Sequence, residues 1–99
     1  MNTRNRMRPI HPGEILREEY LAPTGMSANR LAQCLHVPAN RITGIVRGVR
    51  GITAETALRL ARYFRTSAEF WMNLQKTYDL RIAEERIGAE INREVKPAA

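Results

Sequence analysis

The sequence predicts an all-α protein, on three observations. Apolar residues recur at helical spacing, residues that favour helix ends fall between these stretches, and no segment is typical of a β-strand. The 99 residues suffice for one small domain with a single core. We expect five helices within residues 10–92, a flexible basic arm at residues 1–9 and a frayed tail at residues 93–99.

The first two helices are bounded by recognisable start and stop residues. Proline is tolerated at the first helical position, so one helix is predicted to begin at Pro12, and Pro23 with Gly25 is expected to end it. Ser27 is a good N-cap for the second helix. The apolar positions of this second helix are Leu31, Ala32 and Leu35.

Three further helices follow. The third is predicted over residues 38–47 and is closed by Gly48, and the fourth follows Thr53 as its N-cap. Thr66 and Glu69 have the T-x-x-E spacing of a capping box, which predicts that the fifth helix begins at Thr66. The fifth helix carries Phe70, Trp71, Leu74 and Tyr78, and then a weaker apolar pattern through Ile82, Ile87 and Ile91.

Positive charge is concentrated in the first two thirds of the chain. The formal net charge is +6; residues 1–65 contain 11 arginines against 4 Asp and Glu, whereas residues 66–99 contain 5 Lys and Arg against 6 Asp and Glu. The planar guanidinium of arginine matches phosphates and guanine edges. This distribution favours an anionic partner for the first four helices.

The third helix has two faces of opposite character. Ile42, Ile45 and Val46 share one face, which we expect to be buried against the first two helices. The other face is polar and cationic, so it can enter a DNA major groove about 12 Å wide. Pro38 starts the helix abruptly, which leaves its amide-rich N-terminus exposed toward phosphates.

Side chains on the outer face of this helix suit the reading of bases. Asn40 can pair with adenine through two hydrogen bonds, and Thr43 offers a hydroxyl group and a methyl group that suits thymine. Gly44 has no side chain and would let the helix backbone approach the bases. Arg41 and Arg47 can grip guanine or phosphate. The third helix is therefore predicted to read double-stranded DNA.

The segment "LAQCLHVPANRITGIVRG" resembles the helix-turn-helix of phage-repressor-type (Xre-family) regulators. Around it, "HPGEIL", "ALRLA" and "EFWMNLQ" are similar to motifs of HigA antitoxins, and the resemblance covers about residues 10–80. It implies a five-helix, phage-repressor-like fold. It also implies a dimeric repressor that binds its own operator and neutralises a HigB-type toxin, which is a ribosome-dependent mRNA endonuclease.

The resemblance assigns roles to individual positions. Ala28 stands where many members of the superfamily have a glutamine that anchors the second helix to DNA, and Asn29 and Arg30 are the neighbouring residues that can take over this contact. The predicted base-reading residues are Ala39, Asn40, Thr43 and Gly44, and the predicted phosphate-contacting residues are Asn29, Arg30, Arg41, Arg47 and Arg50.

Partner surfaces are predicted on the fifth helix. An aromatic-rich terminal helix can seal a small core and also form a dimer interface. The acidic-leaning end of this helix, with Glu84, Glu85 and Glu90, is a candidate docking surface for the toxin. The residues predicted at the homodimer interface are Phe70, Trp71, Leu74 and Tyr78.

Two other function classes stay open. One is a solitary Xre-family repressor without a toxin. A small basic open reading frame next to the gene would indicate an antitoxin, and its absence would indicate the solitary repressor. The other is a protein-interaction module that binds only a toxin, and the cationic residues Arg41, Arg47 and Arg50 argue against it.

The sequence does not indicate an enzyme, a metal site or a cofactor. His11 and His36 are far apart in the chain and have no second cysteine nearby, and no glycine-rich phosphate loop is present. Cys34 and His36 would lie on different sides of a helix end, so they do not form a nucleophile and base. The lone cysteine, the lack of a signal-like apolar region and the lack of an apolar run of roughly 18 residues predict a cytoplasmic protein without a membrane span.

Overall fold

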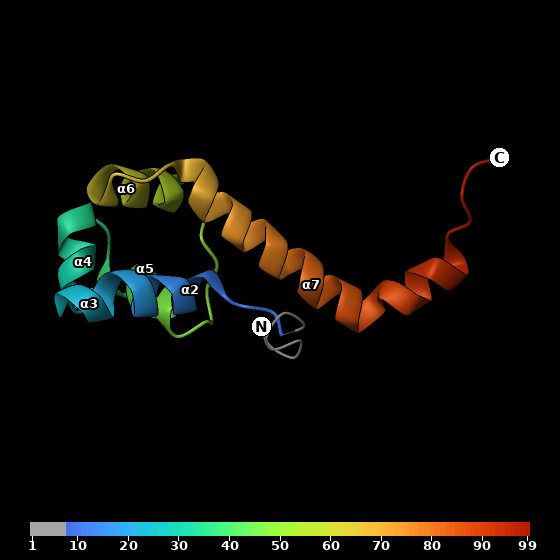
Figure 1. Cartoon of the computed structure of the whole chain (residues 1–99), viewed down its shortest axis with the longest axis horizontal. Coiled ribbons are helices and arrows are strands. Elements are labelled where there is room, and N and C mark those ends of the chain that lie inside the picture. Colours follow the sequence, from blue (N-terminus) through green and yellow to red (C-terminus); the bar gives the residue numbers. More distant parts are fainter. Residues whose placement is uncertain (1–7) are drawn as a thin grey trace.

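The computed structural model describes residues 8–99, and the regular structure of this part of the chain is helical throughout (Figure 1). The first helix is continuous and consists of α2 (Pro12–Ile15), the π-helical turn η1 (Leu16–Leu21) and α3 (Ala22–Thr24). It is followed by α4 (Ala28–Leu35), α5 (Ala39–Val46), α6 (Ala54–Phe64) and α7 (Ala68–Glu94). The prediction of an all-α protein with five helices is confirmed for the described residues. Most of the predicted basic arm, residues 1–7, lies outside them.

The first helix begins where the sequence predicts but ends differently. Its N-terminus is capped by His11, because Nδ1 of this side chain accepts a hydrogen bond from the Gly13 amide at 2.9 Å. Pro23 does not end the helix, contrary to the prediction, and lies within α3. The wider π-helical turn before it relieves the clash of a proline ring with the preceding turn. Gly25 ends the helix with a φ of 67°, which favours glycine.

Each of the five helices contributes to one core. Trp71 is the largest fully buried side chain, and the rings of Tyr20, Phe64 and Phe70 surround it at centroid distances of 5.0, 6.4 and 5.0 Å. The predicted inner face of α5 is confirmed for Ile42 and Ile45, which have no exposed surface, whereas Val46 is only partly buried at the edge of the core. The other buried apolar residues are Leu16, Leu21, Leu31, Ala32, Leu35, Ile52, Ala57 and Leu60.

The start of α7 differs by one residue from the predicted capping box. Ser67 is the N-cap, because its hydroxyl oxygen accepts a hydrogen bond from the Phe70 amide at 3.0 Å. Thr66 has another role: its Oγ1 accepts a hydrogen bond from Nε1 of Trp71 at 2.8 Å. The predicted N-cap role of Thr66 was therefore wrong, because the buried indole needs a hydrogen-bond acceptor and Thr66 provides it.

The long helix α7 leaves the globular body (Figure 1). Its first part packs against α6 and α2, whereas its outer part projects alone, and the molecule extends 51 Å along its longest axis. The weak apolar pattern after Tyr78 is thus helical as far as Glu94, and residues 95–99 have no regular structure. Among the described residues, no helix is long and apolar enough to cross a membrane.

Candidate nucleic-acid interface

A tight turn joins α4 to α5. The α4 helix ends at His36, which has the left-handed conformation with φ 60°, and the Val37 amide closes the turn by donating to the carbonyl oxygen of Ala32 at 3.1 Å. Pro38 is extended, with φ −60° and ψ 145°, and α5 begins at the next residue. Proline has no amide hydrogen to leave unpaired and has the φ that the turn requires. The pair of helices therefore has helix-turn-helix connectivity.

The outer face of α5 is available for contact. Ala39 and Asn40 in the first turn are exposed, and so is Arg47 at the end, whereas Thr43 is partly exposed. Among the described residues, the Asn40 side chain makes no hydrogen bond within the protein, so both its amide donor and its acceptor are free. Because Ile42 and Ile45 anchor the opposite face in the core, this side of α5 points outward.

Arg41 has an acidic neighbour that the sequence did not reveal. Its Nη1 lies 3.4 Å from Oε2 of Glu55, and the same oxygen lies 3.1 Å from Nη2 of Arg59. The hydrogen bond from Arg59, together with the charges of Arg41 and Arg59, lowers the pKa of Glu55. Arg59 is tied further to the body by its Nη1, which donates to the Leu35 carbonyl at 2.9 Å. Glu55 therefore links the edge of α5 to α6.

Gly44 makes room for Arg50. A Cβ atom on Gly44 would lie 3.2 Å from Cβ and 3.6 Å from Cδ of Arg50, so the arginine stem covers the side of α5 that the glycine leaves open. The amides of Val49 and Arg50 also donate to the Gly44 carbonyl, at 3.0 and 3.2 Å. Sequence reasoning missed this contact; whether Gly44 also approaches bases stays a prediction.

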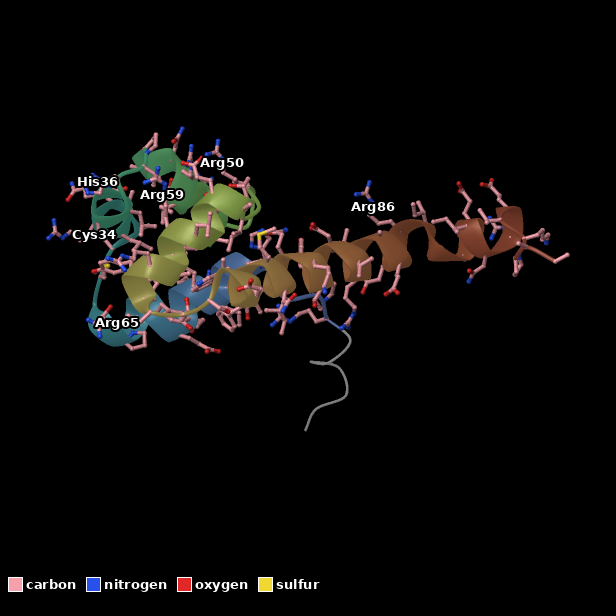
Figure 2. The ribbon with its side chains drawn as sticks, turned by 90° about the horizontal axis from the view of Figure 1, so that it is seen from above. Cys34, His36, Arg50, Arg59, Arg65 and Arg86 are labelled. Carbon is pink, nitrogen blue, oxygen red and sulfur yellow. The ribbon has the colours of Figure 1, made fainter. Side chains whose placement is uncertain are left out.

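The turn after α5 presents three exposed residues beside the outer face. Gly48, with a φ of 79°, reverses the chain, and Arg47, Val49 and Arg50 lie around it. Val49 is 74% exposed, and it was not singled out from the sequence. In Figure 2, Arg50 projects from the body, far from Arg65 on the opposite side and from Arg86 on the outer part of α7.

Two of the residues predicted to contact phosphates lie at the N-terminus of α4. Asn29 and Arg30 are exposed there, and the Ser27 hydroxyl caps the helix by accepting from the Arg30 amide at 3.0 Å. The Arg30 guanidinium is held by Oε1 of Gln33 at 3.1 Å. Ala28 is partly buried and contributes to the core edge, so it offers little surface to a partner.

A groove lies beside the edge of α5. Its volume is about 740 Å³, and it runs between α5, the segment after it, the start of α6 and α7. Arg41 and Arg50 line it with Glu55 and Asp79, so cationic and anionic groups are both present. The groove thus has mixed charge, whereas Arg47 stands outside it.

The predicted dimer residues have different positions in the fold. Trp71 has no exposed surface and so offers nothing to a partner, which corrects its inclusion in the predicted interface. Phe70 is partly buried. Leu74 and Tyr78 line a cavity of about 220 Å³ together with Ile10 and Ile15. The outer part of α7 adds apolar residues that sequence reasoning did not place in an interface, namely Leu80, Ile87 and Ile91, which are 57%, 46% and 44% exposed.

The residues considered for metal or nucleophilic chemistry lie apart. Within residues 8–99, no three His, Cys, Asp or Glu side chains are arranged to hold a metal ion. His11 is the cap of α2, where burial is the main cause that lowers its pKa. Cys34 is a free thiol that lines a shallow surface cavity with His36 and Tyr63.

Known proteins are similar to this chain in sequence. A helix-turn-helix family model matches residues 16–71, which is more than half of the chain. Virulence-associated protein I of Dichelobacter nodosus is 61% identical over 82 residues, covering 83% of this chain and 76% of that protein.

Two solved structures are similar over nearly their whole length. An addiction module antidote protein of a HigA family from Coxiella burnetii is 55% identical with a TM-score of 0.88, covering 92% of this chain and 99% of that one. The Pseudomonas aeruginosa antitoxin HigA, solved with the higBA promoter, is 51% identical with a TM-score of 0.91, covering 93% and 100%. On this evidence the chain belongs to the HigA-type antitoxins of the Xre-like helix-turn-helix family, which are DNA-binding regulators and not enzymes.

Proposed function

We propose that the protein is a sequence-specific DNA-binding antitoxin that represses its own operon and neutralises a HigB-type mRNA endonuclease. The observation that carries the DNA-binding part is the outer face of α5. It presents Asn40 with free hydrogen-bonding groups above the buried Ile42 and Ile45. The similar Pseudomonas aeruginosa HigA was solved with the higBA promoter, which supports an operator as the partner.

On DNA, α5 would lie in the major groove. Ala39, Asn40 and Thr43 would then meet base edges, and Gly44 would lie next to them on the same helix. Arg47 and Arg50 would contact phosphates on one side of the groove, and Asn29 and Arg30 at the start of α4 would contact phosphates on the other. Arg41 would contact a phosphate while it remains paired with Glu55, whose negative charge would weaken that contact.

A homodimer would place two copies of α5 on one operator. Two recognition helices about 34 to 36 Å apart match successive major grooves on one side of the duplex. We place the dimer surface on α7, where Phe70, Leu74 and Tyr78 are partly exposed and the outer apolar residues project from the body. Burial of this outer stripe would remove apolar surface from water, which stabilises association.

Toxin neutralisation is supported by the HigA-type relatives. The toxin docking surface is proposed on the outer part of α7, where Glu84, Glu85 and Glu90 are all exposed and can meet a basic nuclease. The protein would act in the cytoplasm, where its operator and the toxin's mRNA substrates are found.

The test of the proposed function has two parts. Purified protein is titrated against the DNA upstream of its own gene and against a scrambled duplex of the same length, and a clear preference for the upstream DNA is expected. The neighbouring reading frame is then co-expressed with the protein, and its product is expected to co-purify and to lose its mRNA-cleaving activity. DNA preference without a toxin would leave a solitary repressor, whereas equal affinity for both duplexes would contradict sequence-specific binding.

A further inference from the structure

Gln75 of α7 reaches the segment that follows the recognition helix α5. Its Oε1 accepts a hydrogen bond from the Ile52 amide at 2.7 Å, across 23 positions of sequence. Its Nε2 donates to Oδ1 of Asp79, one turn further along α7, at 3.0 Å. Ile52 is itself buried, so this hydrogen bond is partly shielded from solvent. The side-chain amide of Gln75 is thus fixed at both ends and fixes the backbone at Ile52.

Gly51 is fitted to the same side chain. A Cβ atom on Gly51 would lie 3.1 Å from both Nε2 and Oε1 of Gln75, which is closer than side chains normally approach. Because the two hydrogen bonds of Gln75 hold it in place, it cannot move aside without breaking one of them. The chain after α5 therefore passes close to the Gln75 amide, in space that even a Cβ atom on residue 51 would crowd.

A second contact from α7 holds the beginning of this segment. The ring of Tyr78 packs edge-on against the ring of His11 with a centroid distance of 4.9 Å. His11 in turn lies beside Gly48, where an added Cβ atom would be 3.9 Å from its Cγ. The α7 helix therefore supports residues 48–52 from both ends, through Tyr78 with His11 at one and through Gln75 at the other.

The supported segment carries the cationic residues beside α5. Arg50 lies two residues before Ile52, and its stem lies on Gly44 of α5. Arg47 directly precedes Gly48. Because only one residue separates Ile52 from Arg50, a displacement of the backbone at Ile52 would strain the 3.2 Å hydrogen bond from the Arg50 amide to the Gly44 carbonyl and shift Arg50 relative to α5.

We propose that Gln75 is a positioning residue for DNA binding. It holds residues 48–52 so that Arg50 stays beside α5, where its guanidinium can contact a DNA phosphate when α5 lies in the major groove. This inference rests on the proposed DNA-binding function. It makes α7 part of the DNA-reading structure, although Gln75 itself touches no DNA.

The first variant removes the hydrogen bonds of Gln75. Gln75→Met has a side chain of similar length, accepts no hydrogen bond from Ile52 and donates none to Asp79. Operator affinity is expected to fall roughly 2- to 30-fold, the range of residues that act without touching the ligand. The magnitude of the salt slope is expected to fall by about one unit per lost phosphate contact, which a purely structural role would leave unchanged. Asn73→Met, at an exposed position of the same helix, is the matched control and should bind as the parent does.

The second variant perturbs the contact from the loop side. Gly51→Ala keeps Gln75 but forces a Cβ atom against its amide, so the same loss of affinity and the same change of slope are expected. Its control is Ala22→Ser, at an exposed position of α3 that lies outside every surface proposed to contact DNA or a partner. Far-ultraviolet circular dichroism shows whether Gln75→Met folds. If it does not, the proposal is tested with Gly51→Ala and with the double variant Gln75→Glu with Asp79→Asn.

The third variant keeps both hydrogen bonds of residue 75 but exchanges the amide and the carboxylate between positions 75 and 79. In Gln75→Glu with Asp79→Asn, a carboxylate oxygen accepts from Ile52 and the new side-chain amide at position 79 donates to the carboxylate, while the total charge stays the same. Affinity and salt slope are expected to return to those of the parent. The proposal is overturned if Gln75→Met and Gly51→Ala bind operator with the parent's affinity and slope, or if the exchange variant binds as weakly as Gln75→Met. A parent protein that does not distinguish operator from scrambled DNA would instead contradict the proposed function, so the two failures are separable.

Discussion

Gly13 of α2 packs directly on the backbone carbonyl of Ile45 in α5, in space that a Cβ atom would fill. The contact brings the first helix onto the recognition helix at the point where Ile45 is completely buried. It also explains why a glycine stands in the first turn of a helix, where its flexibility is otherwise unfavourable. The position of α5 relative to the body thus depends on a residue without a side chain.

Replacement of this glycine should disturb the fold. Gly13→Ala is expected to lower the free energy of unfolding by about 1 to 3 kcal/mol, because α2 must move away from α5 to admit the methyl group. Urea unfolding followed by circular dichroism measures the change. Gly88→Ala is the control and should be neutral or stabilising by up to about 1 kcal/mol, since alanine favours helix and the site is open. A Gly13→Ala protein as stable as the parent would show that α2 and α5 are not in this close contact.

The Thr66 hydroxyl should stabilise the core through Trp71. Thr66→Val has nearly the same shape but leaves the buried indole Nε1 without an acceptor, so a loss of about 1 to 3 kcal/mol in the free energy of unfolding is expected. Thr77→Val, at an exposed position of α7, is the matched control. Equal stability of the two variants would mean that the indole hydrogen bond contributes nothing.

Two helix ends carry a side chain where glycine is favoured. His36 and Arg65 are left-handed, with φ of 60° and 59°, at the ends of α4 and α6. Left-handed backbone costs a residue with a Cβ atom about 1 to 2 kcal/mol. His36→Gly and Arg65→Gly should therefore each raise the free energy of unfolding by roughly 0.5 to 1 kcal/mol, after the larger unfolded-state entropy of glycine is subtracted. His36→Ala keeps the unfavourable conformation and should give no gain; an equal gain from alanine and glycine would contradict this explanation.

The outer part of α7 should hold the dimer together. Ile87→Glu places a charge in the proposed apolar interface, and it is expected to shift the protein from dimer to monomer in light scattering at micromolar concentration. Leu58→Glu is a matched control, because Leu58 is also an exposed apolar residue, at 63%, but lies on α6. If the Leu58 variant loses the dimer and the Ile87 variant does not, the dimer interface lies on α6 and not on the outer part of α7.

Much of the fold could be predicted because its signals are local. Ser27 and Thr53 were predicted as N-caps and act as such, and the spacing of Ile42 and Ile45 identified the buried face of α5. The errors arose where tertiary structure decides. Thr66 and Ser67 are equally suited to cap a helix, and the indole of Trp71 determines which of them does so.

The candidate site was predictable in part for the same reason. The exposed face that presents Asn40 follows from helical spacing alone. The contacts that set the position of the neighbouring arginines do not: the side chain of Arg50 lies on Gly44, and Gln75 reaches Ile52 over 23 positions of sequence. No local pattern in a single sequence encodes such a pairing, because it depends on how α7 lies against the body.

The outer face of α5 is proposed to read DNA, with different tasks for Asn40 and Arg47. Asn40→Ala should cost about 1 to 3 kcal/mol on the correct operator and leave the affinity for scrambled DNA nearly unchanged, because a base contact carries specificity. Arg47→Ala should weaken the binding of both duplexes and reduce the magnitude of the salt slope by about one unit per lost phosphate contact.

Neither substitution touches the buried residues of α5, so thermal unfolding should match that of the parent and serves as the control. The most direct measurement is a salt titration of operator and scrambled DNA by fluorescence anisotropy for the parent and both variants. We expect operator preference to fall in Asn40→Ala and the salt slope to fall in Arg47→Ala. If Asn40→Ala keeps the parent's preference while Arg47→Ala keeps the parent's salt slope, α5 is not the element that reads DNA.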